Sequence, residues 1–160
     1  MKIHIVGIAG SGKTTLARLA AGRFAIEAFD LDHMVYDSET GERPGEEIVR
    51  QLDKIRRHDG WVTEGAYRNA WLTPLLDDAT AIVWLDVSLA TATARIVKRH
   101  ARAELSRNNP HRGWIRLMRL LSYNRRTASA QRAETIDLLA PYANKVCRCR
   151  SSLDVAAFKT

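Results

Sequence analysis

The sequence predicts one domain of the doubly wound α/β class, and three observations support this prediction. Its 160 residues suit a single compact domain, so we expect residues 1–160 to fold together. Short apolar runs typical of strands alternate with longer amphipathic stretches, which indicates a parallel sheet with right-handed crossovers. A glycine-rich motif stands between the first apolar run and the first amphipathic stretch, the context in which such a motif binds phosphate.

The first part of the chain is expected to form two strands and two helices. Lys2–Val6 is an apolar run of strand length, and Lys13–Arg23 follows the glycine-rich motif as a helix. Ala25–Phe29 is the next short strand. Gly45–His58 carries apolar residues at positions 48, 49, 52 and 55, a spacing that puts them on one face of a helix.

The second part of the chain continues the alternation. Trp61–Glu64 is a short strand, and the nearly continuous apolar run Ala81–Leu85 predicts a buried strand. Ser88 can cap a helix that runs to about Arg102. The remaining segments are a basic loop, a long helix, a last strand and a short helix: Arg102–Arg112, Trp114–Arg132, Lys145–Arg150 and Leu153–Phe158.

The composition excludes several classes of protein. Hydrophobic residues make up 46% and charged residues 27%, which argues against wholesale disorder. No apolar run approaches the roughly 18 residues of a membrane span, and the N-terminus does not predict a signal peptide. Cys147 and Cys149 fit neither a zinc site nor a disulfide framework and are expected to be small apolar residues on one strand face. We expect a cytoplasmic monomer or homodimer whose core includes His4, Trp61, Trp71 and Trp84.

Positive charge is concentrated in one segment. Arg95–Arg132 holds eleven Lys and Arg residues against one acid, Glu104, so its net charge is +10 and that of the rest is −3. This excess indicates a polyanionic ligand, either nucleotide phosphates or a nucleic acid backbone. The alternative is a set of solvated helix faces in an arginine-rich chain.

The strongest signal is the motif from Gly7 to Thr14, which matches G-x-x-x-x-G-K-[ST], the P-loop. Its glycines let backbone amides surround a phosphate, and the start of the following helix adds partial positive charge. Lys13 is expected to reach the β- and γ-phosphates of ATP, and the Thr14 hydroxyl to coordinate Mg²⁺. The predicted ATP-binding residues of the motif are Gly10, Ser11, Gly12, Lys13, Thr14 and Thr15. The short chain and the lack of N-K-x-D favour a small-molecule kinase over a GTPase.

Four segments carry a family resemblance: GIAGSGKTTLA (7–17), DLD (30–32), WVTEGAYR (61–68) and ARIVKRH (94–100). With them the chain resembles the nucleoside-monophosphate-kinase-like P-loop kinases. It is most similar to bacterial adenylate-kinase-related members called topology modulation proteins. The resemblance implies a three-layer sandwich with a five-stranded parallel sheet in the order 2-3-1-4-5. It also implies a short arginine-rich lid at about residues 102–113.

The resemblance assigns roles to single residues. Glu64 would hold a water of the magnesium ion, and Arg68 would grip the acceptor. Arg95 would stack on the ATP base, and Arg99 would meet the phosphates and neutralise charge on the transferred group. Further candidates in and after the lid are Arg107, Arg125 and Arg126, and weak candidates near the base are Ser151 and Ser152.

The segment after the second strand departs from adenylate kinase. Asp30-Leu31-Asp32-His33 stands where that family has the threonine-glycine and arginine that hold AMP. Acids here resemble kinases whose acceptor is a hydroxyl, such as shikimate kinase, because a carboxylate can orient a hydroxyl or accept its proton. We expect Asp32 on the acceptor hydroxyl, Asp30 beside it and Arg68 on an anionic group of the same acceptor. The alternative is that one of the two aspartates caps a helix.

The sequence therefore predicts an ATP- and Mg²⁺-dependent phosphotransferase whose acceptor is not identified. One alternative is a nucleotide-dependent regulator that binds nucleic acid through the basic segment. Another is a kinase of the 5′-hydroxyl of an oligonucleotide. Nucleic acid binding is not favoured, because aromatic residues are not interleaved with the cations.

Overall fold

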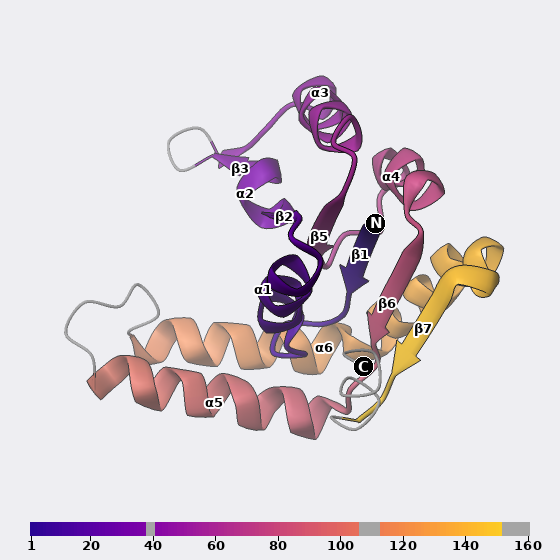
Figure 1. Ribbon diagram of the computed structural model, residues 1–160. Helices are drawn as coiled ribbons and strands as arrows, with labels where there is room; N and C mark the ends of the chain where they lie inside the picture. The colour runs from indigo at the N-terminus through magenta and orange to yellow at the C-terminus, as the bar shows by residue number, and fades with distance from the viewer. Residues whose placement is uncertain (38–40, 106–112, 152–160) are drawn as a thin grey trace.

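Five parallel strands form the central sheet of the computed structural model, which describes residues 1–37, 41–105 and 113–151 (Figure 1). The strands of this sheet are β1 (Lys2–Val6), β2 (Glu27–Asp30), β5 (Trp61–Gly65), β6 (Ala81–Leu85) and β7 (Val146–Cys149). They lie in the order β2-β5-β1-β6-β7, and every neighbouring pair is parallel. Counted along the chain within this sheet, the order is 2-3-1-4-5, so the predicted fold class and topology are confirmed.

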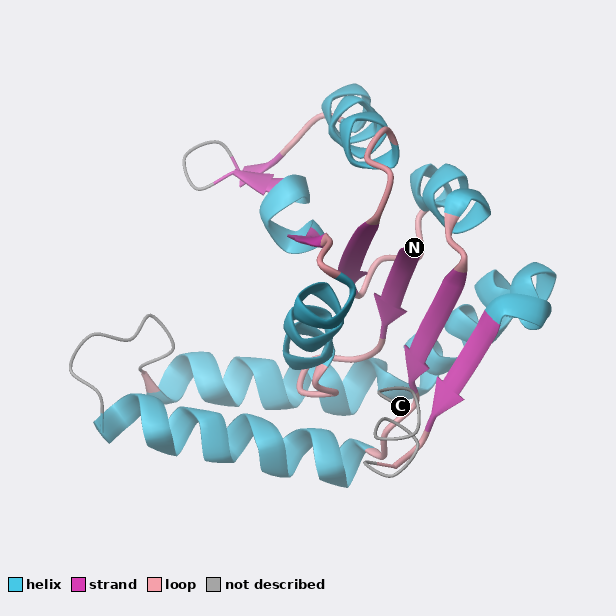
Figure 2. Ribbon diagram, viewed as in Figure 1, coloured by secondary structure: helices cyan, strands magenta, loops and turns pink. Residues whose placement is uncertain are grey.

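Helices cover the sheet on both faces (Figure 2). They are α1 (Lys13–Phe24), α2 (Leu31–Val35), α3 (Gly45–Arg56), α4 (Thr73–Asp78), α5 (Leu89–Leu105) and α6 (Trp114–Leu139). α5 and α6 run along each other beside the carboxyl ends of the strands. None of the described helices combines the length and the apolar character needed to cross a membrane.

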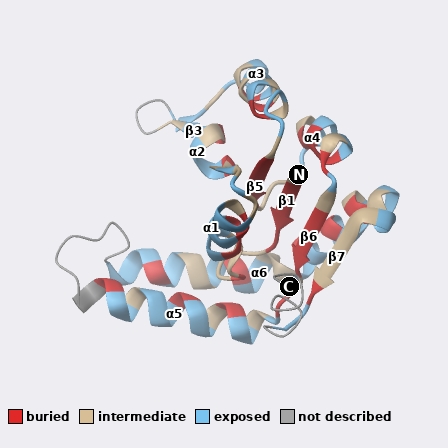
Figure 3. Cartoon of the chain, in the orientation of Figure 1, coloured by how far each residue is buried: buried red, intermediate tan, exposed pale blue. Residues whose placement is uncertain are grey.

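Two hydrophobic clusters hold the layers together (Figure 3). Because successive strand residues face opposite sides, Ile3 and Ile5 of β1 pack against α1, while Val6 faces the other side. That second side is covered by α3, α4 and the end of α6. Trp61 and Trp84 are buried in this second cluster as predicted, and Trp71 packs against its edge.

Most element boundaries agree with the predictions, and the differences have local causes. β2 begins at Glu27 rather than Ala25, because Ala25 closes α1 in the left-handed conformation, with φ 52°. α6 continues past Arg132 to Leu139, because the residues between them include neither glycine nor proline, and the longer helix places Leu139 in the core. Ser88 caps α5 as predicted, since its hydroxyl accepts a hydrogen bond from the Thr91 amide.

Several short elements were not predicted. They are α2, α4, the antiparallel pair β3 (Tyr36–Asp37) and β4 (Gly41–Glu42), and the 3₁₀ turns η1 (Ala70–Leu72) and η2 (Ala140–Lys145). Each is too short to show a clear period in the sequence. The predicted helix Leu153–Phe158 and most of the predicted lid at 102–113 lie outside the described residues, while α5 continues to Leu105.

His4 and the two cysteines have the structural surroundings expected of them. His4 is fully buried in β1, and its Nδ1 lies 2.9 Å from the Thr63 hydroxyl of β5. Burial, and secondly the positive charge of Lys13, lowers the pKa of His4 to about 3. Cys147 and Cys149 share one face of β7, with their sulfur atoms 3.9 Å apart.

Candidate functional site

The P-loop forms the connection between β1 and α1 at the carboxyl edge of the sheet. Gly10 and Gly12 have positive φ angles of 81° and 104°, which favour glycine. A Cβ at Gly10 would also lie 2.6 Å from the carbonyl oxygen of Ala92 in α5. Gly12 is the N-cap of α1 and has no side chain to occupy the first amides, so these amides can bind an anion.

Two side chains from other elements hold the P-loop backbone. The Arg95 guanidinium donates a hydrogen bond to the Ser11 carbonyl oxygen over 2.5 Å. The Asn124 side-chain amide donates to the Ala9 carbonyl oxygen over 2.9 Å. Through these two side chains, α5 and α6 hold the backbone of the P-loop in place. Arg95 contacts the loop backbone here, and its stacking on a base stays a prediction.

Lys13, Thr14 and Glu64 form the polar centre of the site. The Thr14 hydroxyl donates to Glu64 Oε1 over 2.5 Å, and Lys13 Nζ lies 3.4 Å from the Ile8 carbonyl oxygen. Burial lowers the pKa of Lys13, and the carboxylates of Glu64, Asp32 and Asp30 oppose that effect. Burial raises the pKa of Glu64. The hydrogen bond from Thr14 and the charge of Lys13 lower this pKa, but the effect of burial is larger.

Asp30 is the last residue of β2, and Asp32 lies in the first turn of α2. Asp30 Oδ1 accepts a hydrogen bond from the Asp32 amide over 2.8 Å, so Asp30 caps α2 in addition to facing the site. Both line the same cavity as the P-loop, as does His33, whose imidazole is exposed.

Tyr67 is a site residue that the sequence analysis missed. Burial raises its pKa first, and the charge of Asp32 and a hydrogen bond to that carboxylate raise it further. The Tyr67 ring packs against Trp71, with ring centroids 5.3 Å apart. Tyr67 therefore orients Asp32 from the connection that follows β5. Its position between Glu64 and Arg68, in the segment already singled out, was a signal that could have identified it.

These groups open into one cavity of about 1370 Å³. Asp30, Asp32 and Glu64 line it together with the P-loop, so the structure brings these predicted residues together. Arg99 also lines it, as do further cations from α1, α5 and α6: Arg18, Arg95, Lys98, Arg102, Arg116 and Arg119. The cavity is therefore acidic at the end of β2 and β5 and basic on the opposite helices.

The predicted arginines of α6, Arg125 and Arg126, do not line this cavity. Arg126 is exposed and lines no part of it. The reason is distance along α6, since Arg126 lies about 10 Å farther along the helix than Arg119. Arg125 lines a second cavity, and Arg107 lies outside the described residues.

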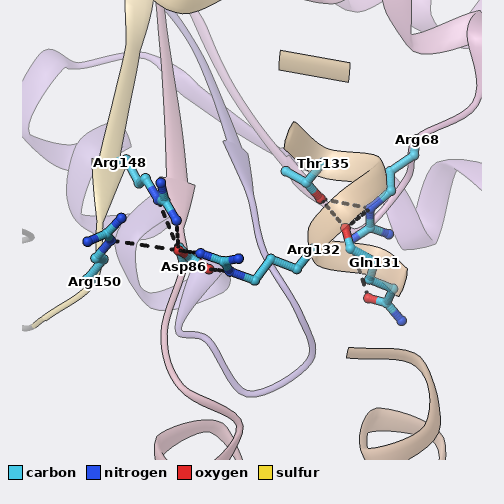
Figure 4. Close-up of polar contacts among 7 residues, drawn as sticks. All are labelled: Arg68, Asp86, Gln131, Arg132, Thr135, Arg148 and Arg150. Atoms are coloured by element: carbon cyan, nitrogen blue, oxygen red, sulfur yellow. Dashed lines mark hydrogen bonds and ion pairs between the residues drawn. The ribbon is translucent and has the colours of Figure 1, made fainter. Parts of the chain in front are cut away.

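Arg68 was expected beside Asp32, and the structure does not place it there. Its guanidinium turns toward α6, where Nε donates to the Thr135 hydroxyl over 2.8 Å and to the Gln131 carbonyl oxygen over 3.0 Å (Figure 4). The other nitrogens donate to the Ala66 carbonyl oxygen and to Gln131 Oε1. Arg68 lines the second cavity, of about 620 Å³, and not the P-loop cavity.

Asp86, directly after β6, was also missed. Its carboxylate accepts hydrogen bonds from Arg132 and Arg148 and lies 3.9 Å from Arg150 (Figure 4). Burial raises the pKa of Asp86, but these hydrogen bonds outweigh burial and the net pKa is lowered. The signal was available, because an acid after an apolar strand was the same pattern that identified Asp30 and Glu64.

The residues present fit a nucleoside triphosphate with Mg²⁺. The first amides of α1 and Lys13 suit phosphate oxygens, and the oxygens of Thr14, Glu64 and Asp32 are ligands of the kind Mg²⁺ prefers. Among the described residues, no group of three or more His, Cys, Asp or Glu could hold a metal ion alone. A magnesium ion here would therefore share its ligands with phosphates and water, as is usual for this ion.

Comparison with known proteins found similarity to proteins named shikimate kinase. No protein-family model matches the chain. Over 108 residues, or 59% of the chain, it is 30% identical to a protein named shikimate kinase from Sulfurihydrogenibium sp. (strain YO3AOP1), and the match spans 65% of that relative. The naming as a topology modulation protein stays a prediction.

Two solved shikimate kinases also align with the chain. The enzyme from Acinetobacter baumannii, in complex with shikimate, is 20% identical, with 90% of this chain and 94% of that one covered and a TM-score of 0.46. The enzyme from Bacteroides thetaiotaomicron is 15% identical, with 83% and 82% covered and a TM-score of 0.49.

Proposed function

We propose that this protein is a kinase that transfers a phosphoryl group from ATP to a hydroxyl of a small molecule. The observation that carries the proposal is the single cavity into which the P-loop, Glu64 and Asp32 all open. A phosphate site, ligands for Mg²⁺ and a carboxylate for the acceptor are the parts such a reaction requires. The similarity to a relative named shikimate kinase supports the same reaction class.

The donor side uses the P-loop. When bound, ATP·Mg²⁺ supplies the phosphoryl group and neutralises part of its charge. The backbone from Gly10 to Thr15 and the ammonium group of Lys13 bind the phosphates, and Thr14 and Glu64 hold the metal directly or through water. Arg99 lines the same cavity and neutralises charge that develops on the transferred group.

The acceptor side uses the end of β2. Asp32 orients the acceptor hydroxyl and takes its proton, and Tyr67 fixes the direction of the Asp32 carboxylate. Because Arg68 lies in the second cavity, Arg116 and Arg119 are better placed to bind an anionic group of the acceptor. A hydroxylated carboxylic acid has both features, and shikimate is the first such acid to test.

The position of the basic segment favours a small ligand over nucleic acid. Lys98, Arg99 and Arg102 of α5 line the P-loop cavity together with cations of α6. A regulator that binds duplex nucleic acid would instead lose affinity steeply with salt, with a slope near −0.9 per phosphate contacted. A salt titration with an oligonucleotide separates the two functions.

Lys13→Ala is expected to abolish stabilisation by ATP·Mg²⁺. At about 100 times its Kd, a ligand that binds only the folded state adds about 2.7 kcal/mol to the free energy of unfolding. For a chain of this size, that raises the melting temperature by roughly 5–10 °C. Thermal unfolding of wild type, Lys13→Ala and Lys54→Ala, with and without ATP·Mg²⁺, measures the effect. Lys54 is an exposed lysine of α3 and serves as the control. An equal rise for wild type and Lys13→Ala would overturn the assignment of the donor site.

A further inference from the structure

The second cavity is distinct from the P-loop cavity. Gly7 and Ile8 of the P-loop line the second cavity, whereas the P-loop residues from Ala9 onwards line the P-loop cavity. The end of β6, the start of α5 and the middle of α6 form its walls. Leu85 is the one lining residue that the two cavities share among the described residues.

The lining of this second cavity is strongly basic. Arg68, Arg125, Arg132 and Arg150 line it, and Asp86 is the one acid among its described lining residues, which leaves a net charge of +3. Asp86 accepts hydrogen bonds from Arg132 at 3.0 and 3.3 Å and from Arg148, whose guanidinium lies 4.4 Å from the Trp84 ring centroid. These contacts hold the cations in place before any ligand arrives, which lowers the entropic cost of binding.

Arg68 gives the cavity a positive charge that is largely but not fully buried and that donates its hydrogen bonds to neutral groups. Its side chain is 13% exposed and its four hydrogen bonds end on carbonyl, hydroxyl and amide oxygens. Within the described part of the chain, one carboxylate lies at ion-pair distance, Glu134 at 3.9 Å, and it is 60% exposed. Burial lowers the pKa of Arg68. Even partial burial of a cation without a close anion costs free energy, and an anion in the cavity would offset that cost.

Arg125 supplies a cation at the rim. It is exposed on α6, and none of the described residues forms an ion pair with it. Arginine presents a planar fork of donors that matches carboxylate and phosphate oxygens. A ligand with a single charge would leave most of the positive charge of the cavity uncompensated.

We propose that the second cavity binds a small organic polyanion, phosphorylated or polycarboxylic, with two or more negative charges. It does so independently of the P-loop, and the proposal does not rest on the kinase reaction. Pyrophosphate and citrate are suitable probes, because each represents one of the two sources of such charge.

Calorimetric titration at about physiological salt tests this site in the Lys13→Ala background, where the P-loop no longer binds phosphate strongly. We expect at least one of the two probes to bind with a stoichiometry of one. Adding Arg125→Ala is expected to weaken that binding about tenfold or more, the usual effect of removing a charged hydrogen-bond partner. Arg126→Ala removes the same charge from the next residue, which lines neither cavity, and is expected to change the affinity by less than about twofold.

Two results would overturn the site. One is that neither probe binds the Lys13→Ala chain. The other is that Arg125→Ala and Arg126→Ala weaken binding equally, since this indicates general attraction to a basic protein. If Lys13→Ala does not fold, the stoichiometry of the wild type decides: a fall from two pyrophosphates per chain to one on Arg125→Ala supports the site, and no change contradicts it.

Discussion

Replacing Asp32 with asparagine is expected to lower kcat about 10²–10⁴-fold, the usual contribution of a general base. The substitution keeps the shape of the side chain but removes its ability to take a proton from the acceptor hydroxyl. Affinity for ATP should stay within a few-fold, because the P-loop binds the donor. A coupled ADP-release assay measures kcat, with shikimate and other hydroxylated acids as acceptors and AMP as the comparison.

Two further variants sharpen this experiment. Asp59→Asn makes the same chemical change at an exposed position outside both cavities, and its kcat should equal that of the wild type. Tyr67→Phe removes the hydroxyl that holds Asp32 but leaves the carboxylate, so its loss should be smaller, about tenfold or less. The assignment of Asp32 fails if Asp32→Asn phosphorylates the same acceptor at the wild-type rate. Efficient conversion of AMP to ADP would show that the acceptor group is a phosphate and not a hydroxyl.

The main features of the fold were predictable because they depend on local patterns. Strands buried on both faces, such as Ala81–Leu85, read as continuous apolar runs, and the alternation with helices leaves few possible topologies. The pair β3 and β4 was not predictable, because strands of two residues have no period. α2 depends on the cap that Asp30 provides, and the sequence left open which of the two aspartates would cap a helix.

The site was predictable where its residues are close together in the sequence. The P-loop is one continuous motif, and the parallel strands β2 and β5 bring Asp30 and Glu64 to neighbouring positions in register. Arg68 shows the limit of this reasoning. Its position after β5 was correct, but its direction depends on Gln131 and Thr135, more than 60 residues away. No local pattern carries information about such partners.

The sequence showed the excess positive charge of the basic segment, but it did not show that this charge is divided between two cavities. α6 is long enough to extend beyond one cavity into the next, so Arg119 lines the first and Arg125 the second. Composition over Arg95–Arg132 cannot separate them, because both cavities draw on the same helix. The helical rise along α6 separates them once the position of the P-loop is known.

Lowering the pH from 6.5 to 3 is expected to remove up to about 5 kcal/mol from the free energy of unfolding through His4 alone. The pKa of His4 is about 3 in the folded chain against 6.5 for an ordinary histidine. Above pH 6.5 both states are neutral and the contribution is fully present. Below pH 6.5, His4 binds a proton in the unfolded chain but not in the folded chain. The free energy of unfolding therefore falls by about 1.4 kcal/mol per pH unit. The cause is burial, since His4 Nε2 has no hydrogen-bond partner within the described part of the chain and protonation would place an unpaired N–H there.

Urea unfolding between pH 6.5 and 5 isolates this contribution, because most carboxylates stay ionised over that range. The wild type should lose about 1.5–2 kcal/mol more than His4→Gln, which cannot be protonated but can still form a hydrogen bond with Thr63. His58→Gln changes a histidine whose side chain is 46% exposed, and it should keep the pH dependence of the wild type. His4→Gln will be less stable than the wild type at every pH, so the difference in slope, and not the stability itself, is the measurement. Equal slopes for the wild type and His4→Gln would show that the pKa of His4 is the same in the folded and the unfolded chain, and would contradict the prediction.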